Sequence, residues 1–277
     1  MASRFSQGFR HLLTLRGASA VPAPPSHILD QAFTSTRSTI RAPGLVNAWL
    51  AVTTSTLLTV NSPESIGHLY KFATRDESSK PKSLSERVAA AELMREAGVK
   101  CAVFAGVPKT INGLAGLYQS LPDDVKAALP KDNPRNQASK ATNQENGLKL
   151  FKSVFAPTDE ETLGKLQSFH PDFGGWLVEH VYGGLLSQVP GHNHLSRTLT
   201  SAVAVASLRA LGGVGPQLVT HSNGLVNARG FNARGFDPAE TDDDRWLASE
   251  QGAEWVIGVS DAISDAVVGP PVEKAKP

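Results

Sequence analysis

The sequence predicts an all-α protein, and three observations support this fold class. Apolar residues recur at steps of three or four, as from Leu195 through Leu199 to Val203, which is the spacing of one helical face. Serine or threonine followed three residues later by glutamate, as in Ser83 and Glu86, marks a helix start. No run of useful length alternates apolar with polar residues, as a half-buried strand would. We therefore expect layers of helices that cover one another's apolar faces.

The first 41 residues are interpreted as a leader that precedes the helical core. Arg4, Arg10 and Arg16 lie among serines, and the first acidic residue is Asp30. An amphipathic, arginine-containing and acid-poor segment is typical of a mitochondrial transit peptide. We expect residues 1–41 to be a targeting or disordered segment and the protein to be mitochondrial, with the cytoplasm as the alternative location. An ordinary basic tail is the other interpretation of this segment.

The segment from 42 to 130 is expected to form an N-terminal helical half. Its first sustained apolar helix begins at Leu45, but polar residues interrupt the run before Val60, so we expect no membrane span. The Ser–Glu box noted above opens another helix, which we expect to run toward Val107. Apolar residues at steps of three and four give that helix one buried face.

A polar segment, residues 131–146, separates this half from the rest of the chain. It has no aromatic residue and is broken by a proline, which is typical of a linker. The C-terminal half, residues 147–268, has its own helix starts: a box at Thr158 and a proline-containing box over residues 237–240. Residues 269–277 form a polar tail.

The two halves share a faint internal similarity. Residues 104–111 read FAGVPKTI and residues 256–263 read VIGVSDAI, and each stretch follows a helix with an acidic start. A degenerate duplication leaves such a trace, and a chance match of small and apolar residues is the alternative. We therefore interpret the fold as two helical halves, with duplication as a hypothesis for their origin.

The composition is that of a globular protein and limits its partners. The chain has 277 residues, enough for one large domain or two small ones, of which 40% are apolar and 19% charged. Its net charge of +1 gives no reason to expect a nucleic-acid partner. Cys101 is the single cysteine, so neither an intramolecular disulfide nor a cysteine-based metal site can form. Because it lies in an apolar run, we expect a buried, unreactive thiol.

The stretch from 176 to 230 carries several short motifs in a fixed order. An E-x-x-x-G helix end is followed by a Pro-Gly turn, a Ser/Thr-rich apolar helix and then L-x-x-H-x-x-G-L-x-N. Residues 92–114 add F-x-G-x-P-x-x-x-N, which closes a helical unit. Together these motifs resemble the carboxymuconolactone decarboxylase and alkylhydroperoxidase-D (AhpD)-like superfamily, most closely its uncharacterised fungal members. The resemblance implies an AhpD-like helical bundle with a pocket.

Peroxidase members of this superfamily work through a C-x-x-C-x-x-x-H motif. One thiolate attacks the peroxide, the second cysteine forms a disulfide, and the histidine relays protons. The resemblance places His221 at the histidine position and Val214 and Gln217 at the two cysteine positions. Neither of these two residues is a nucleophile, so we expect that the protein is not a disulfide peroxidase.

Decarboxylase members instead carry a glutamate, an arginine and a histidine at matching positions. The resemblance therefore implies Glu179, Arg197 and His221 as candidate catalytic residues. Lactone decarboxylation requires a cation that holds carboxylates and an acid that protonates the developing enolate carbon. Arg197 fits the first role, and His221 or Glu179 fits the second. The alternatives are a core histidine, a surface glutamate and an arginine in a structural ion pair.

Three histidines near the Pro-Gly turn raise the question of a metal site. His192 and His194 are too close together to share one helix face, and no acidic neighbour supports them. His180 lies in the preceding helix. We therefore expect the histidines to belong to a loop and its flanking helices, and we expect neither a metal nor a cofactor.

Two functions of different classes follow from these patterns. The first is a non-catalytic or divergent mitochondrial member that keeps the fold as an interaction or assembly module. The alternative is a cofactor-free decarboxylase or lyase that acts on a small carboxylated molecule, and it requires Glu179 and His221 to converge on one cavity. We expect a monomer or small homo-oligomer, because the second half can cover the face that a neighbouring subunit would otherwise cover.

Overall fold

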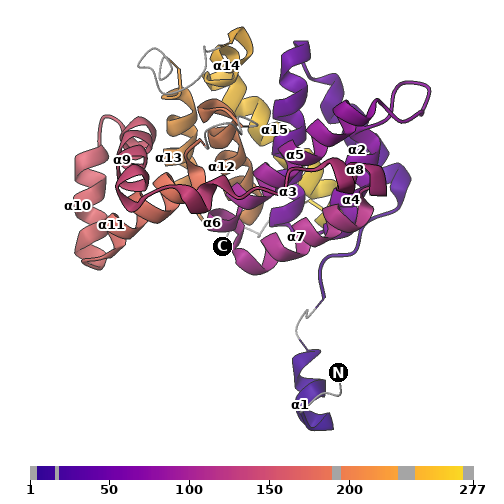
Figure 1. Cartoon of the computed structure of the whole chain (residues 1–277), viewed down its shortest axis with the longest axis horizontal. Coiled ribbons are helices and arrows are strands. Elements are labelled where there is room, and N and C mark those ends of the chain that lie inside the picture. Colours follow the sequence, from indigo (N-terminus) through magenta and orange to yellow (C-terminus); the bar gives the residue numbers. More distant parts are fainter. Residues whose placement is uncertain (1–4, 16–18, 189–194, 230–240, 271–277) are drawn as a thin grey trace, which may run out of the picture.

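The computed structural model describes residues 5–15, 19–188, 195–229 and 241–270 (Figure 1). Within these ranges all regular structure is helical, apart from one isolated bridge between Arg75 and Pro81. The all-α prediction is therefore confirmed for the described part of the chain.

The helices follow one another with short connections. In chain order they are α1 (Gln7–Leu13), α2 (Ser26–Ser38), η1 (Pro43–Leu45), α3 (Val46–Thr59), α4 (Pro63–Ala73), α5 (Leu84–Lys100), α6 (Ala102–Ala105), α7 (Val107–Ser120), α8 (Asp123–Ala128), η2 (Pro134–Gln137), α9 (Lys140–Phe155), α10 (Asp159–Phe169), α11 (Phe173–Trp176), the π-helical η3 (Leu177–Leu186), α12 (Arg197–Leu211), α13 (Gly215–Val226), α14 (Asp242–Leu247) and α15 (Glu250–Val268).

Helix α3 lies at the centre of the larger of two hydrophobic cores. Every residue over 48–59 is buried, and α4, α5, α7, α12 and α15 all contact this helix. Its buried hydroxyls bond to carbonyls one turn back: Thr54 Oγ1 to Leu50 O at 2.7 Å and Ser55 Oγ to Ala51 O at 2.6 Å. These bonds satisfy most of the buried hydroxyls of this Ser/Thr-rich helix, whereas Thr53 Oγ1 is buried and has no hydrogen-bond partner among the described residues.

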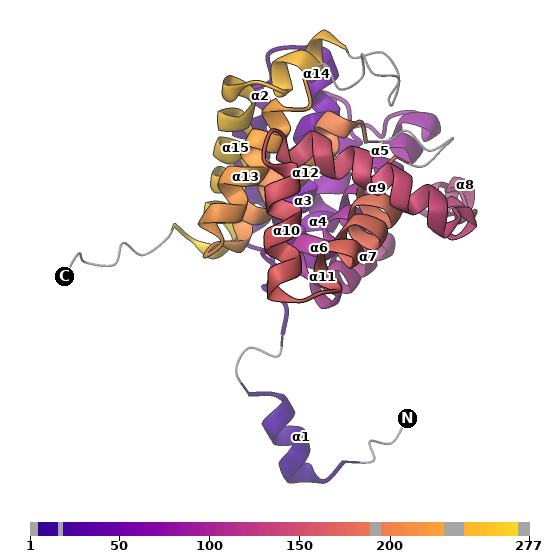
Figure 2. The same cartoon turned by 90° about the vertical axis from the view of Figure 1, so that its left-hand side faces the viewer.

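Helix α2 belongs to this large core, although the sequence analysis assigned residues 1–41 to a leader. Leu29 and Phe33 are buried, and Trp49 Nε1 donates to Thr36 Oγ1 at 3.0 Å. Only α1 stands away from the body of the molecule, as two perpendicular views show (Figures 1 and 2). The apolar i, i+4 pair in α2 is the signal that the leader interpretation overlooked.

The smaller core lies at the other end of the molecule from α2 and α4, beside α10 and α11 (Figure 1). It is built where α9 packs along η3. Glycines allow this contact, because a Cβ at Gly147 would lie 1.9 Å from Val178 O and one at Gly183 would lie 1.9 Å from Asn143 O. The two backbones therefore approach closely at both positions.

The two cores do not follow the two halves expected from the sequence. Helices α12 and α15 come after residues 131–146, yet both pack against α3 in the large core. The buried residues of the small core all come from the segment that runs from α9 to η3, and Val103 and Phe104 of α6 pack against them. Apolar faces from both sides of the polar segment have thus combined into one core.

Helix starts were predicted with mixed success. The Ser83–Glu86 capping box is present, but α5 ends at Lys100 rather than running to Val107. Gly106, with φ of 87°, separates α6 from α7. Thr158 precedes α10 without a side-chain capping bond, and residues 237–240 lie outside the described residues. No described helix combines the length and apolar character that crossing a bilayer requires.

Candidate functional site

Arg197 lies where the small core meets the large one. It is the first residue of α12 and is 4% exposed. Its Nε donates to Ser153 Oγ of α9 at 3.2 Å, its Nη2 to Gly224 O of α13 at 2.9 Å, and its Nη1 to Ser201 Oγ one turn ahead. All three guanidinium nitrogens therefore bond to the protein, and together they join α9, α12 and α13.

The L-x-x-H-x-x-G-L-x-N motif makes the close contact of α13 with α9. A Cβ at Gly224 would lie 2.8 Å from Val154 Cγ1 and 3.2 Å from Val154 O, so only glycine fits without movement. Leu225 is fully buried, and Asn227 Nδ2 donates to Ala156 O at 2.9 Å, just beyond the end of α9. The glycine, second leucine and asparagine of the motif thus have packing or capping roles.

His221, the histidine of this motif, lies between two phenyl rings. Its ring meets Phe104 edge-on at a centroid distance of 5.4 Å and Phe155 at 6.1 Å. Burial lowers the pKa of His221 to about 4, and the positive charge of Arg197 lowers it further in the same direction. The imidazole is therefore neutral near pH 7, and it makes no hydrogen bond with any described residue.

Tyr182 of η3 completes the aromatic cluster, and the sequence analysis did not identify it. Its ring lies 5.2 Å from Phe151 and 5.8 Å from Phe155, and its side chain is buried. Burial raises the pKa of its hydroxyl, an effect that the nearby charge of Arg197 opposes. The i, i+4 spacing of the two phenylalanines was the available signal for an aromatic cluster.

Glu179 pairs with other groups. Its carboxylate lies 3.5 Å from Lys140 Nζ and 3.6 Å from His180 Nε2. Within the described ranges, no hydrogen bond or ion pair joins it to Arg197 or His221. The structure therefore brings two of the three predicted site residues into electrostatic contact, while the third takes part in a separate ion-pair group.

A second buried cation, Lys100, also joins the two cores, and nothing in its sequence context identified it. It is 1% exposed, and its ammonium donates to Leu186 O of η3 and Thr200 Oγ1 of α12, both at 2.8 Å. The Glu96 carboxylate lies 3.9 Å from the same ammonium. A lysine in an amphipathic helix is normally exposed, so there was no reason in the sequence to expect a buried one. The burial of Lys100 results from how the helices pack.

The single cysteine is buried in the large core. Cys101 Sγ lies 3.4 Å from Ser207 Oγ, and burial raises the pKa of the thiol. A protonated, enclosed thiol without a second cysteine cannot complete a thiol–disulfide cycle. Of the three histidines considered for a metal, His192 and His194 lie outside the described residues.

Comparisons with known proteins find distant relatives only. No family model matches the chain, and no solved structure matches it. Peroxisomal protein 2 of Saccharomyces cerevisiae is 26% identical over 239 residues, which cover 67% of this chain and 82% of that protein. Peroxisomal protein 2 of Schizosaccharomyces pombe is 25% identical over 134 residues, 48% of this chain and 59% of that protein. The resemblance to the AhpD-like superfamily stays a prediction.

Both relatives are named for the peroxisome. This contradicts the mitochondrial prediction and also its cytoplasmic alternative. The physical basis of the error lies in the leader. Helix α1 exposes Phe9, Leu12 and Leu13 and carries Arg10, so the segment is amphipathic and basic. These properties describe a surface that is able to bind a groove or a membrane, and they do not identify an organelle.

Proposed function

We propose that this chain is a peroxisomal protein with an AhpD-like helical bundle that acts as a non-catalytic interaction or assembly module. The peroxisomal assignment rests on the names of its two relatives. The non-catalytic assignment rests on one observation above all: the nitrogens of Arg197 are used to join three helices.

An arginine that binds a substrate carboxylate presents two parallel N–H groups to it. Here Nη1 and Nη2 of Arg197 already donate to Ser201 Oγ and Gly224 O, and Nε donates to Ser153 Oγ. A carboxylate would have to displace these bonds and leave buried acceptors without donors, at a cost of about 1–3 kcal/mol for each acceptor. This favours a structural arginine over a substrate clamp.

The packing roles of the surrounding motif point the same way. Gly183, Gly224 and Asn227 all serve helix contacts with α9, and the Glu179 carboxylate pairs with Lys140. The residues that carry the resemblance therefore have sufficient reasons to be present without any reaction.

A catalytic screen tests this proposal. The purified full chain would be incubated with small lactones and keto acids that bear a carboxylate, and carbon dioxide release would be followed. We expect no turnover above that of the His221→Ala variant. Turnover by the wild type that is lost in this variant would overturn the non-catalytic proposal.

The second candidate function is a cofactor-free decarboxylase or lyase, and one observation favours it. His221 has no hydrogen-bond partner among the described residues, so its neutral imidazole can accept a proton, although a pKa of about 4 makes it a weak base near pH 7. A base with this pKa would give a rate that rises with pH through about 4 and is constant near pH 7. A rate that rose through about pH 6.5 would instead indicate an unperturbed histidine elsewhere.

A further inference from the structure

A cavity of about 350 Å³ is lined by residues of α2, α3, α4 and α5. Its walls include the buried side chains of Trp49 and Leu50 from α3 and of Leu93 from α5. Two cations, Arg37 of α2 and Lys82 just before α5, also line it. A partly open pocket lined by apolar side chains and a few charged groups has the usual composition of a small-molecule site.

The same two cations line a second, more open cavity of about 1000 Å³. Lys71 and Arg75 add two further positive charges to it. Three acids also line this groove. Of these, Asp30 is bonded to His68 at 2.7 Å, and Asp76 accepts backbone N–H groups of its own loop at 2.9 and 2.8 Å. The Arg37 and Lys82 side chains thus line both the smaller pocket and a groove whose lining has four basic residues and three acidic ones, Asp30, Asp76 and Glu77.

Arg37 is half-buried, and its guanidinium is not used by the protein. Its one recorded contact is with the Trp49 ring, whose centroid lies 5.9 Å from Cζ. No described residue accepts a hydrogen bond from it or forms an ion pair with it. Its planar set of N–H donors matches a carboxylate or a phosphate, which bind arginine through two parallel bonds.

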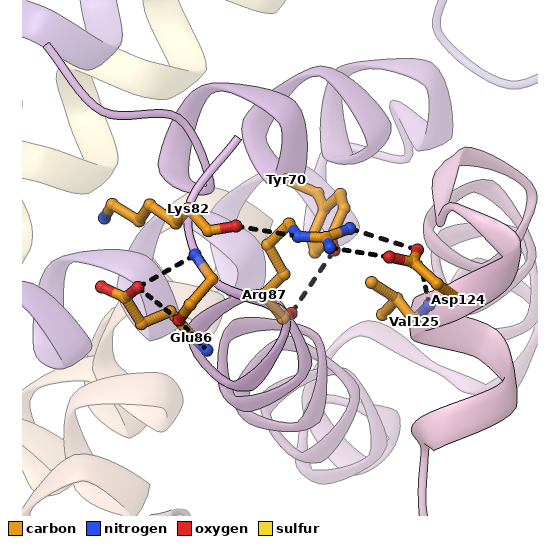
Figure 3. A network of polar contacts seen from close by, with 7 residues as sticks. Tyr70, Lys82, Glu86, Arg87, Asp124 and Val125 are labelled. Carbon is orange, nitrogen blue, oxygen red and sulfur yellow. Dashed lines mark hydrogen bonds and ion pairs between the residues drawn. The ribbon is translucent and has the colours of Figure 1, made fainter. Parts of the chain in front are cut away.

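Lys82 is held in position by a network centred on Arg87 (Figure 3). Arg87 Nε donates to Lys82 O at 3.1 Å, and its Nη1 and Nη2 bind the Asp124 carboxylate of α8 at 3.2 and 2.7 Å. The Tyr70 hydroxyl of α4 donates to Arg87 O at 3.4 Å. These bonds fix the backbone of Lys82 against three helices, which preorganises the position of its side chain.

The Lys82 side chain extends away from this network (Figure 3). Its ammonium donates to Ala73 O at 3.0 Å, which uses one of its three N–H groups. The nearby Glu86 carboxylate is occupied by the Ser83 backbone N–H at 3.1 Å and the Ser83 hydroxyl at 2.6 Å. The Glu86 carboxylate stays ionised, because its hydrogen bonds to Ser83 and the nearby charge of Lys82 lower its pKa. Beside this acid, Lys82 keeps two N–H donors and Arg37 keeps its guanidinium available for a ligand.

We propose that these two cavities, which share Arg37 and Lys82, bind a small amphiphilic anion. Its apolar body lies on Val46, Ala89 and Ala90, and its carboxylate or phosphate head lies between Arg37 and Lys82. The inference goes beyond the proposed function, because this site shares no residue with the cluster of Arg197 and His221. Its test therefore does not depend on whether the cluster of Arg197 and His221 is catalytic.

Calorimetric titration of the full chain tests the proposal with matched probes. Octanoate and octyl phosphate carry the two candidate heads on one chain, 1-octanol lacks the charge, and inorganic phosphate lacks the apolar body. We expect both anions to bind at least about tenfold more tightly than 1-octanol or inorganic phosphate, with the tighter of the two identifying the head group. Equal binding of octanoate and 1-octanol, or no binding of either anion, would overturn the proposal.

Variants locate the binding. Arg37→Gln and Lys82→Gln are each expected to weaken anion binding about tenfold, which corresponds to ~1.4 kcal/mol. Ala89→Phe, at an exposed position of the pocket wall, is expected to block the apolar part while α5 stays folded. Lys152→Gln, an exposed lysine on α9, is the charge-matched control and should bind as the wild type does. Wild-type affinity in both Arg37→Gln and Ala89→Phe would contradict the assignment.

Discussion

Arg197 and Arg37 are two shielded arginines in opposite circumstances. Arg197 lies at the junction of the cores and uses all three guanidinium nitrogens to hold α9, α12 and α13 together. Arg37 lies between two cavities, touches the Trp49 ring and forms no hydrogen bond with a described residue. The difference indicates that burial of a cation does not by itself mark a functional site. The use of its donors separates a structural arginine from one that is available to a ligand.

The largest expected effect is the loss of the Arg197 side chain. Arg197→Gln removes donors from Ser153, Ser201 and Gly224 O in a buried setting, and it should lower the free energy of unfolding by about 3 kcal/mol. Urea denaturation of the full chain measures this. Arg37→Gln, the matched control, is expected to change the same quantity by less than about 1 kcal/mol. Equal losses of unfolding free energy in the two variants would contradict the distinction between a structural Arg197 and an available Arg37.

The pH dependence of stability tests the surroundings of His221. The unfolded chain binds a proton on this residue near pH 6.5 and the folded chain only near pH 4, so between these values the unfolded state carries more protons. Stability is therefore complete above about pH 6.5 and is lost as the pH falls toward 4. We expect His221 to contribute a loss of about 3 kcal/mol, and His221→Phe should remove this contribution. A His221→Phe variant with the wild-type pH profile would contradict the depressed pKa.

The contact of α13 with α9 is tested by a pair of glycines. Gly224→Ala would place a Cβ 2.8 Å from Val154 Cγ1, and we expect it to destabilise the fold by about 1–2 kcal/mol. Gly164→Ala in α10 meets no atom within 4 Å, so the better helix former should stabilise by about 0.5 kcal/mol. Thermal unfolding of both variants measures the difference. A Gly224→Ala variant that is as stable as Gly164→Ala would mean that the motif glycine is not needed for packing.

The sequence predicted features that depend on local patterns. Apolar spacing and the Ser83–Glu86 box indicated helices, because both act within one turn or two of the chain. The same reasoning missed α2, since arginine and serine around Leu29 and Phe33 resembled a leader. The burial of Leu29 and Phe33 in the large core makes α2 part of the fold, although the composition of residues 1–41 is that of a leader.

Two residues of the candidate site were identified from the sequence, but their roles were not. Arg197 and His221 were identified and do lie near each other, but the sequence does not say that Ser153 and Gly224 O take up the donors of the arginine. In the sequence, Lys100 has the appearance of a surface cation, and Arg37 falls in the segment that was interpreted as a leader. Their contrasting environments arise from which helices pack around them, and single-sequence patterns do not encode those partners.

Urea denaturation with and without octanoate, carried out on Arg197→Gln and Arg37→Gln, tests the contrast between the two arginines most directly. A ligand that binds the folded state raises its free energy of unfolding, so one experiment reports both intrinsic stability and binding. We predict that Arg197→Gln is about 3 kcal/mol less stable and keeps the octanoate-induced increase. Arg37→Gln should keep wild-type stability and lose most of that increase. The reverse pattern, with binding lost in Arg197→Gln and stability lost in Arg37→Gln, would contradict the account.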